Sequence, residues 1–181
     1  MKTLDDYIGE NLDILSIGLN PSPPSVEAGI YFAGKRNRFW QALNGAGLID
    51  EELRPSRASM QRLFDTFRIG FTDTVKRPTP GAGDLRRADF LRDVPLLVEK
   101  INSYRPLIAW FHGKVAYRQF LSVSGSAADE LDWGLQPLRI GQSAVFVSPN
   151  PSPANAVFSL QDLIVFYRDL KALRDSLRKT S

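Results

Sequence analysis

Residues 107–111 read Leu-Ile-Ala-Trp-Phe, a continuous apolar run in a chain of 181 residues. A short run of this kind is typical of a parallel strand that is buried on both faces. Residues 14–19 and 144–147 have a similar character, and the first of these two runs stops at Asn20-Pro21. We therefore predict buried strands that end in loops.

Helical patterns lie between the predicted strands. Apolar side chains recur there at the spacing of one face of an amphipathic helix. The expected helices lie around residues 39–46, 59–67, 90–101, 113–120 and 163–177. Strands that alternate with helices predict an α/β protein, a three-layer α/β/α sandwich with a short, mostly parallel central sheet. The length fits a single domain over residues 1–181.

Three loops rich in Pro, Gly and Ser interrupt these patterns. The first covers residues 20–36, the second runs from Gly70-Phe71-Thr72-Asp73 to Gly81, and the third covers residues 148–153. Two of them leave the ends of predicted strands, near residues 20 and 150. Because ligands of parallel sheets bind beyond the carboxyl ends of the strands, we expect these loops to converge on one site.

Composition excludes several classes of site. The chain has no cysteine, so it forms no disulfide, no cysteine-based zinc site and no iron–sulfur cluster. Its single histidine, His112, excludes a multi-histidine metal site, and we expect neither a metal nor a cofactor. The net charge of +3 is compatible with a nucleic-acid partner without requiring one.

The N-terminal residues and the hydropathy of the chain lead to an expectation about its location. Asp5, Asp6 and Glu10 argue against a secretory signal, and the apolar runs are too short to span a membrane. We expect a cytoplasmic monomer that is associated with the nucleoid when it acts.

Five segments, in this order, carry a resemblance to a known family. They are Gly18-Leu19-Asn20-Pro21-Ser22, Asn37-Arg38-Phe39-Trp40, Gly70 to Gly81, Asn150-Pro151-Ser152 and Tyr167 to Lys171. The set resembles the mismatch-specific uracil/thymine DNA glycosylase family of the uracil-DNA glycosylase superfamily and covers nearly the whole chain. Each motif alone is weak, whereas several in order, each at a predicted loop or helix start, are strong.

The resemblance implies a monofunctional enzyme that removes uracil, or a similar pyrimidine, from DNA. The base must leave the stack, because its bond to the sugar is hidden in a duplex. In that family the residue matching Asn20 binds the attacking water, and an amide can hold water without being a strong base. No lysine can be assigned as an amine nucleophile, which argues against a lyase mechanism.

Asp73 departs from the family pattern, since better-known members have Asn or Lys at the matching position. A carboxylate there could accept a proton from water, which Asn cannot do. It could supplement Asn20, carry most of the activity, or stabilise a positively charged sugar. The alternative is that Asp73 only caps a turn.

The predicted base pocket centres on Phe32, which matches a family aromatic that stacks on the flipped base. Tyr31 is the fallback for that role. Either ring could instead pack in the core, although a loop rich in Pro and Gly makes this less expected. The other members of the predicted pocket are Leu19, Thr79 and Asn150. Thr79 matches a family threonine that shapes the pocket, and could instead be an ordinary turn residue.

The loop after Asn150 is expected to contact DNA. The predicted DNA-binding residues are Ser22, Ser152, Pro153, Ala154 and Asn155. The two serines match positions that contact phosphates. Family members often fill the gap left by the flipped base with Leu and Arg, where this chain has Ala154 and Ala156. We therefore expect little selectivity for G·U over A·U or single-stranded uracil.

Basic residues near these motifs could also touch the DNA backbone, although charge on helices is more often a solvated face. They are Lys35, Arg36, Arg38, Lys114 and Arg118. His112 is interpreted as structural, with a role in the pocket left open by its position at a strand end.

Two other functions remain as alternatives. A hydrolase or nucleotide-binding protein is disfavoured, because the chain lacks the Gly-x-Ser-x-Gly, Gly-x-Gly-x-x-Gly and Walker A patterns. A non-catalytic module that binds damaged or single-stranded DNA would keep the basic surface and the stacking aromatic.

Overall fold

A five-stranded sheet forms the centre of the computed structural model, which describes residues 1–126 and 130–180. The strand order is β2-β1-β3-β5-β4, with β1, β2, β3 and β5 parallel and β4 antiparallel to β5. The mostly parallel sheet is thus confirmed. The strands are β1 (Ile14–Gly18), β2 (Ile69–Asp73), β3 (Ile108–His112), β4 (Gly134–Leu135) and β5 (Ala144–Ser148).

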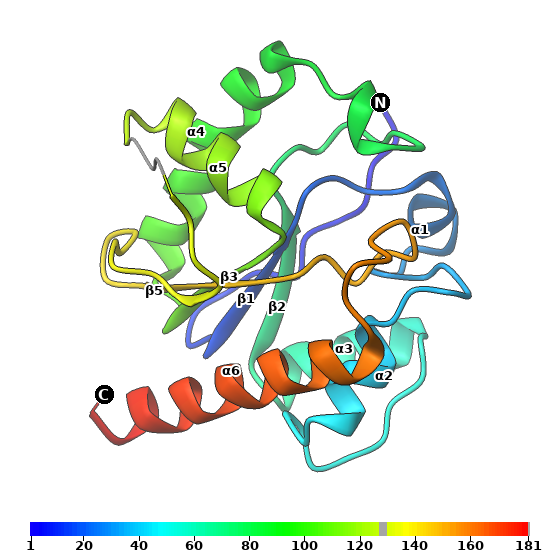
Figure 1. Cartoon of the computed structure of the whole chain (residues 1–181), viewed down its shortest axis with the longest axis vertical. Helices are drawn as coiled ribbons and strands as arrows, with labels where there is room; N and C mark the ends of the chain where they lie inside the picture. The colour runs from blue at the N-terminus through cyan, green and yellow to red at the C-terminus, as the bar shows by residue number, and fades with distance from the viewer. Residues whose placement is uncertain (127–129, 181) are drawn as a thin grey trace.

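Helices cover both faces of the sheet, which confirms the three-layer sandwich (Figure 1). One face packs against α2 (Phe39–Gly45), α3 (Arg57–Asp65) and α6 (Leu160–Thr180). The opposite face packs against α4 (Arg87–Tyr104) and α5 (Lys114–Val123). Two short elements, α1 (Pro23–Ala28) and the 3₁₀ helix η1 (Ala82–Asp84), lie in the loops.

The four parallel strands are buried at every position, as their apolar runs predict. Successive side chains of a strand point to opposite faces. Trp110 therefore packs in the core beneath α2 and α6, and its neighbour Phe111 packs in the core beneath α5.

Strand β2 corrects one expectation, because residues 70–73 are a strand rather than the start of a loop. Gly70 suggested a turn, but it serves a close approach between segments. A Cβ there would lie 2.4 Å from the carbonyl oxygen of Tyr7 and 2.6 Å from Leu12. The N-terminal segment bonds to β2 at this point, through Tyr7 and Phe71. The second loop therefore also leaves a strand end.

Smaller differences concern short elements. The loop over residues 20–36 contains α1, which starts at Pro23 behind the N-cap Ser22 and ends at Gly29 with a positive φ of 69°. The second predicted helix begins two residues earlier, as α3, and β4 was not expected. Elements of two to six residues carry too few apolar positions to reveal a period.

Candidate active site

Three loops meet at the carboxyl edge of the sheet, where β1, β2, β3 and β5 all end (Figure 1). The first and second loops are joined by hydrogen bonds from Val75 N to Leu19 O and from Thr79 N to Pro21 O. Arg38, the N-cap residue of α2 just after the first loop, contacts the third loop, because its N–H donates to Pro151 O at 3.1 Å. The first loop and the residues that follow it therefore contact both of the other loops.

Asn20 is fixed by the second loop. Its side-chain Nδ2 donates to the carbonyl oxygen of Arg77 at 2.9 Å and to Thr79 Oγ1 at 2.8 Å. Thr79 is buried, and its hydroxyl donates in turn to Gly81 O at 2.8 Å. Both amide hydrogens of Asn20 are engaged, so its side-chain oxygen is the atom left to accept a hydrogen bond from water.

Asp73 ends β2 with its carboxylate inside the protein, at an exposed fraction of 4%. Gly18 on the neighbouring strand makes room for it, because a Cβ there would lie 2.7 Å from Asp73 Oδ1. Burial raises the pKa of Asp73 to about 6, against the opposing attraction of Lys76. A carboxyl group with this pKa is ionised at neutral pH and remains basic enough to take a proton.

The alternative in which Asp73 caps a turn has no support in the described residues. There, the carboxylate interacts with the side chains of Lys76 and Tyr31, and no backbone N–H donates to it. The ammonium of Lys76 lies 3.4 Å from Asp73 and 2.8 Å from Asp6. Lys76 and Asp6 were not predicted as site residues, because no local pattern in the sequence links residue 6 to residue 76.

Tyr31 packs inward rather than lining an open loop. Its ring is 3% exposed and lies 5.3 Å from the ring of Phe71. The expectation that its loop would keep the ring out of the core was therefore wrong. Its hydroxyl accepts from Lys76 Nζ at 3.4 Å and lies in the field of the Asp73 and Asp6 carboxylates. Burial raises the pKa of Tyr31 well above its usual value, so the hydroxyl stays protonated and can donate to Asp73.

Phe32 is half-buried in a left-handed backbone conformation, with a φ of 56° that non-glycine residues rarely adopt. Its ring stacks on Phe39 with centroids 4.3 Å apart. The same ring contacts His112 at 5.0 Å. Phe32 thus connects the first loop to the end of β3.

Two other predicted pocket residues, Leu19 and Asn150, are positioned by different contacts. Leu19 is half-buried and packs against the core on the α4 and α5 side of the sheet. Asn150 accepts a hydrogen bond from Ser152 N at 2.9 Å through its side-chain oxygen. Gly113 faces Asn150, since a Cβ on that glycine would lie 3.5 Å from Asn150 Cβ.

Arg38 binds the third loop from inside. Its guanidinium donates to the carbonyl oxygens of Ser152 at 3.1 Å and Asn155 at 2.8 Å, and also to Phe158. The position of Arg38 near the motifs suggested a DNA contact, but these bonds turn its guanidinium inward, where it holds the third loop. Asn155 has a similar role, because its Nδ2 donates to Asn150 O at 3.1 Å. Among the other basic candidates, Lys114 lies over the ring of Trp133 at 4.5 Å, whereas Lys35, Arg36 and Arg118 are exposed.

The two predicted phosphate-binding serines differ in how they use their hydroxyls. Ser22 caps α1, accepting from Ser25 N and donating to Ser25 Oγ at 3.1 Å. Ser152 Oγ accepts from Ala154 N at 3.3 Å, which leaves its hydroxyl hydrogen free to donate.

The tip of the third loop is open to solvent. Pro153 and Ala154 are exposed there. Val157, which has no motif to mark it in the sequence, is 84% exposed in the segment that continues this loop to α6. A valine at that exposure beside an active-site motif is a signal that only the structure provides.

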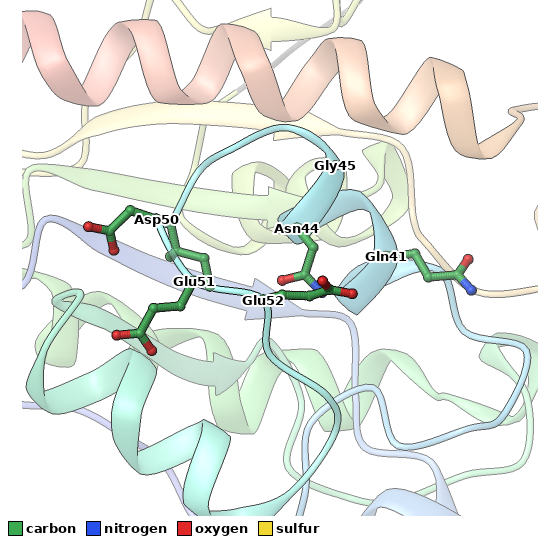
Figure 2. Close-up of a pocket in the computed structure, with 7 residues that line it drawn as sticks. Gln41, Asn44, Gly45, Asp50, Glu51 and Glu52 are labelled. Atoms are coloured by element: carbon green, nitrogen blue, oxygen red, sulfur yellow. The ribbon is translucent and has the colours of Figure 1, made fainter.

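A surface hollow of about 610 Å³ lies away from these residues, at the end of α2 and the loop that follows (Figure 2). It is lined by Gln41, Asn44, Gly45, Ile49, Asp50, Glu51 and Glu52. Three carboxylates would repel the phosphates of DNA. The hollow is therefore not the site predicted from the motifs.

Within residues 1–126 and 130–180, no cluster of three or more acidic or histidine side chains is arranged to hold a metal ion. No helix in the same residues has the length and apolar character needed to cross a membrane.

Comparison with known proteins supports the fold and gives the family. The family model described as the uracil DNA glycosylase superfamily matches residues 6–171. A solution NMR structure from Methanosarcina acetivorans, described as a "putative Uracil DNA glycosylase", has a similar fold, with a TM-score of 0.59 and 19% sequence identity. The match covers 94% of this chain and 98% of that chain.

Proposed function

The chain belongs to the uracil DNA glycosylase superfamily, and from that premise we propose that it is a monofunctional DNA glycosylase that flips uracil, or a related damaged or mismatched base, out of DNA. It hydrolyses the N-glycosidic bond and leaves an abasic site, which initiates base excision repair. The observation that carries this proposal is the fixed amide of Asn20, bonded to Thr79, at the strand edge that also holds the buried Asp73.

Asn20 positions the attacking water in this proposal. Its Nδ2 is held by two acceptors of the second loop, so the amide plane is set before DNA binds. The side-chain oxygen then accepts a hydrogen bond from the water. A preset amide avoids an ordering cost in the transition state.

Asp73 acts as the proton acceptor for that water. The C–N bond breaks with its electron pair leaving on the base, the water oxygen bonds to the sugar carbon, and its proton moves to the Asp73 carboxylate. The same negative charge stabilises the positive character that develops on the sugar. Asp73 thus supplements Asn20 rather than replacing it.

Phe32 provides the apolar face against which the flipped base stacks. An aromatic ring offers such a face to any flat base, pyrimidine or purine, and does not select among them. The stacked contact with Phe39 supports the ring from behind. This fits a base range wider than uracil, and thymine, hypoxanthine, xanthine and ethenocytosine are the substrates to test.

The third loop binds the DNA backbone and the gap left by the flipped base. Ser152 can donate its hydroxyl hydrogen to a phosphate, and Ser22 is the weaker candidate because its hydroxyl donates to Ser25. Val157 fills the gap in place of the small Ala154 and Ala156, since it is the exposed apolar side chain at that tip.

The decisive experiment uses a labelled duplex with one uracil opposite guanine. The wild-type protein should release uracil, and the strand should break at that position only after alkali. Asn20→Ala should lower single-turnover excision by roughly 100-fold or more, within the range for a positioned group. Asn102→Ala, the same change on an exposed position of α4, is the matched control and should leave the rate unchanged.

The alternative function has a distinct outcome in this assay. Wild-type protein that binds the uracil duplex but releases no base would favour the DNA-binding module. Strand breakage without alkali would contradict the monofunctional mechanism.

A further inference from the structure

The ammonium of Lys76 lies between two carboxylates and is closer to the one that was not predicted as part of the site. Its Nζ is 2.8 Å from Asp6 Oδ1 and 3.4 Å from Asp73 Oδ2. The longer of these distances is outside the usual range of N–H···O hydrogen bonds, which is about 2.7–3.2 Å. The cation beside the proposed base is therefore bound mainly by another residue.

Asp6 is held in place by groups from three parts of the chain. Its Oδ1 accepts from Thr72 Oγ1 at 2.9 Å and from Lys76, and its Oδ2 accepts from Lys100 Nζ at 2.6 Å. Thr72 lies on β2 and Lys100 lies on α4. Burial opposes the charge of Asp6, but Lys76 and Lys100 outweigh it and lower the pKa of this carboxyl group. Asp6 is therefore a fixed anion at every pH at which Asp73 changes its charge.

The backbone of Lys76 is anchored as well. Its N–H donates to Asp93 Oδ2 at 2.8 Å, and its carbonyl oxygen accepts from the hydroxyl of Thr3. Thr3 and Asp6 belong to the N-terminal segment, which also bonds to β2 through Tyr7. The N-terminal segment thus holds Lys76 by both its main chain and its side chain.

The charges that face Asp73 come from separate segments. Lys76 of the second loop attracts the ionised carboxylate, whereas Asp6 of the N-terminal segment repels it. Tyr31 of the first loop is neutral, because burial raises its pKa well above the usual value. The end of the neighbouring strand β1 is a glycine, and Lys100 of α4 pairs with Asp6. The charge state of Asp73 therefore depends on where the Lys76 ammonium lies between the two carboxylates.

We propose that Asp6 is a positioning residue of this site, which holds the ammonium of Lys76 back from the Asp73 carboxylate and thereby keeps Asp73 able to accept a proton from the attacking water. This inference rests on the proposed glycosylase function. A carboxylate in a close ion pair is a weaker base, because the opposite charge stabilises its ionised form. A buried carboxylate without a cation would instead stay protonated. One ammonium shared between two carboxylates sets Asp73 between these limits.

The pH profile of excision provides the test, because a merely structural residue would change the rate without moving the midpoint. Single-turnover release of uracil from a G·U duplex should have its midpoint near pH 6 in the wild-type protein, at the pKa of Asp73 of about 6. In Asp6→Asn the ammonium is free to move onto Asp73, so the midpoint should fall by about one pH unit and the plateau rate should fall with it. Lys76→Met removes the cation, and its midpoint should rise by about one pH unit. A midpoint that stays in place in Asp6→Asn, or that fails to rise in Lys76→Met, would overturn the inference.

Two matched variants separate the charge of Asp6 from other effects. Asp5→Asn makes the same change on the exposed neighbouring residue and should leave the midpoint and the rate unchanged. Asp6→Glu keeps the negative charge, and its midpoint should stay closer to wild type than that of Asp6→Asn. A midpoint in Asp6→Glu as low as that in Asp6→Asn would contradict a role of the charge. If Asp6→Asn lacks the circular dichroism of the folded protein, Lys76→Met decides the question alone.

A double variant tests whether Asp6 acts through Lys76. In a Lys76→Met background, Asp6→Asn can remove only the direct repulsion between the two carboxylates. Its effect on the midpoint should therefore be smaller than in the wild-type background. An equally large shift in both backgrounds would show that Lys76 plays no part.

NMR gives a readout that does not depend on excision. The side-chain carboxyl ¹³C signal of Asp73, assigned by its loss in Asp73→Asn, should titrate near pH 6 in the wild-type protein and at lower pH in Asp6→Asn. Base release by the wild-type protein together with an unmoved Asp73 titration in Asp6→Asn would overturn this inference alone. A wild-type protein that releases no base would instead end the proposed function, whatever the carboxyl signal does.

Discussion

Asp73 carries a negative charge inside the protein at the expense of folding stability. The carboxylate is 4% exposed, and its pKa of about 6 lies above the ordinary value of 3.8. Burial is the main cause, and Lys76 only partly offsets it. The folded state therefore binds the proton of Asp73 more tightly than the unfolded state does. Such a cost is expected where a residue is kept for activity rather than for stability.

The pH dependence of excision should follow this carboxyl group. Because the base must be ionised, the single-turnover rate should rise with pH, reach half of its plateau near pH 6 and stay level above pH 7. Asp73→Asn should abolish this rise and lower the rate at pH 8 by at least roughly tenfold. A pH profile of both proteins is the measurement. An unchanged rate in the variant would reduce Asp73 to a structural residue.

The stability of the same variant should change in the opposite direction. Protonated Asp73 contributes stability below pH 4, and this contribution is lost as the pH rises through 6. Asp73→Asn should therefore be more stable than wild type at pH 8, by at most about 3 kcal/mol given 1.36 kcal/mol per pKa unit, and equal to it at pH 4. Urea unfolding at both pH values tests this. A variant that is less stable at pH 8 would show that the ion pair with Lys76 outweighs burial.

At the scale of elements, the third loop depends on a single side chain from the start of α2. Arg38 is the N-cap residue of that helix, and its guanidinium reaches three carbonyl oxygens between residues 152 and 158. The planar guanidinium has five N–H donors in a fixed geometry and can reach several carbonyl oxygens at once, whereas the compact ammonium of lysine cannot. The loop that presents Ser152 and Val157 is thus held by a residue from another part of the chain.

Arg38→Lys keeps the positive charge but removes the planar guanidinium with its several donors. Amide hydrogen exchange over residues 151–158 should accelerate by roughly tenfold or more, and excision from duplex DNA should fall, because the loop loses its fixed shape. Exchange measured by mass spectrometry, together with single-turnover rates, tests this. Arg36→Lys, on an exposed neighbour, is the control and should change neither. A fall in DNA binding without faster loop exchange would mean that Arg38 acts on phosphate instead.

At the scale of the whole molecule, substrate choice depends on which side chains at the carboxyl edge of the sheet contact the DNA duplex. The exposed tip offers Val157, Ala154 and Pro153, and none of these side chains can form a hydrogen bond with the base opposite the flipped one. A good bidentate contact to a base contributes about 1–3 kcal/mol of discrimination. Without one, the protein has little means of telling guanine from adenine across the gap.

Excision of uracil should accordingly be similar in G·U, A·U and single-stranded DNA, within roughly tenfold. Val157→Ser should slow excision from duplexes by roughly tenfold and leave single-stranded DNA unaffected, because only a duplex has a gap to fill. Val165→Ser, the same change at an exposed position of α6, is the matched control. A strong preference for G·U would contradict the first expectation, and equal losses on both kinds of DNA would contradict the second.

Local patterns in the sequence were enough to predict the layers of the fold. The apolar runs at residues 107–111 and 144–147 are strands buried on both faces, and the helical spacing from Phe90 to Ile101 lies within α4. The motif order pointed to the superfamily that the family model then matched. Residues 70–73 were misread because a glycine that permits a close approach looks the same in sequence as one that makes a turn.

What the sequence by itself determined were the sheet, its helical layers, and the loops that hold the predicted catalytic residues. Only the tertiary structure decided the partners of those residues: the Thr79 acceptor of Asn20, the Lys76 ammonium beside Asp73 and the third-loop carbonyl oxygens bound by Arg38. The physical reason is one of range. Periodicity and turn chemistry act over a few neighbouring residues, whereas hydrogen bonds join residues up to 165 positions apart, and contacts of this range fix charge and donor state.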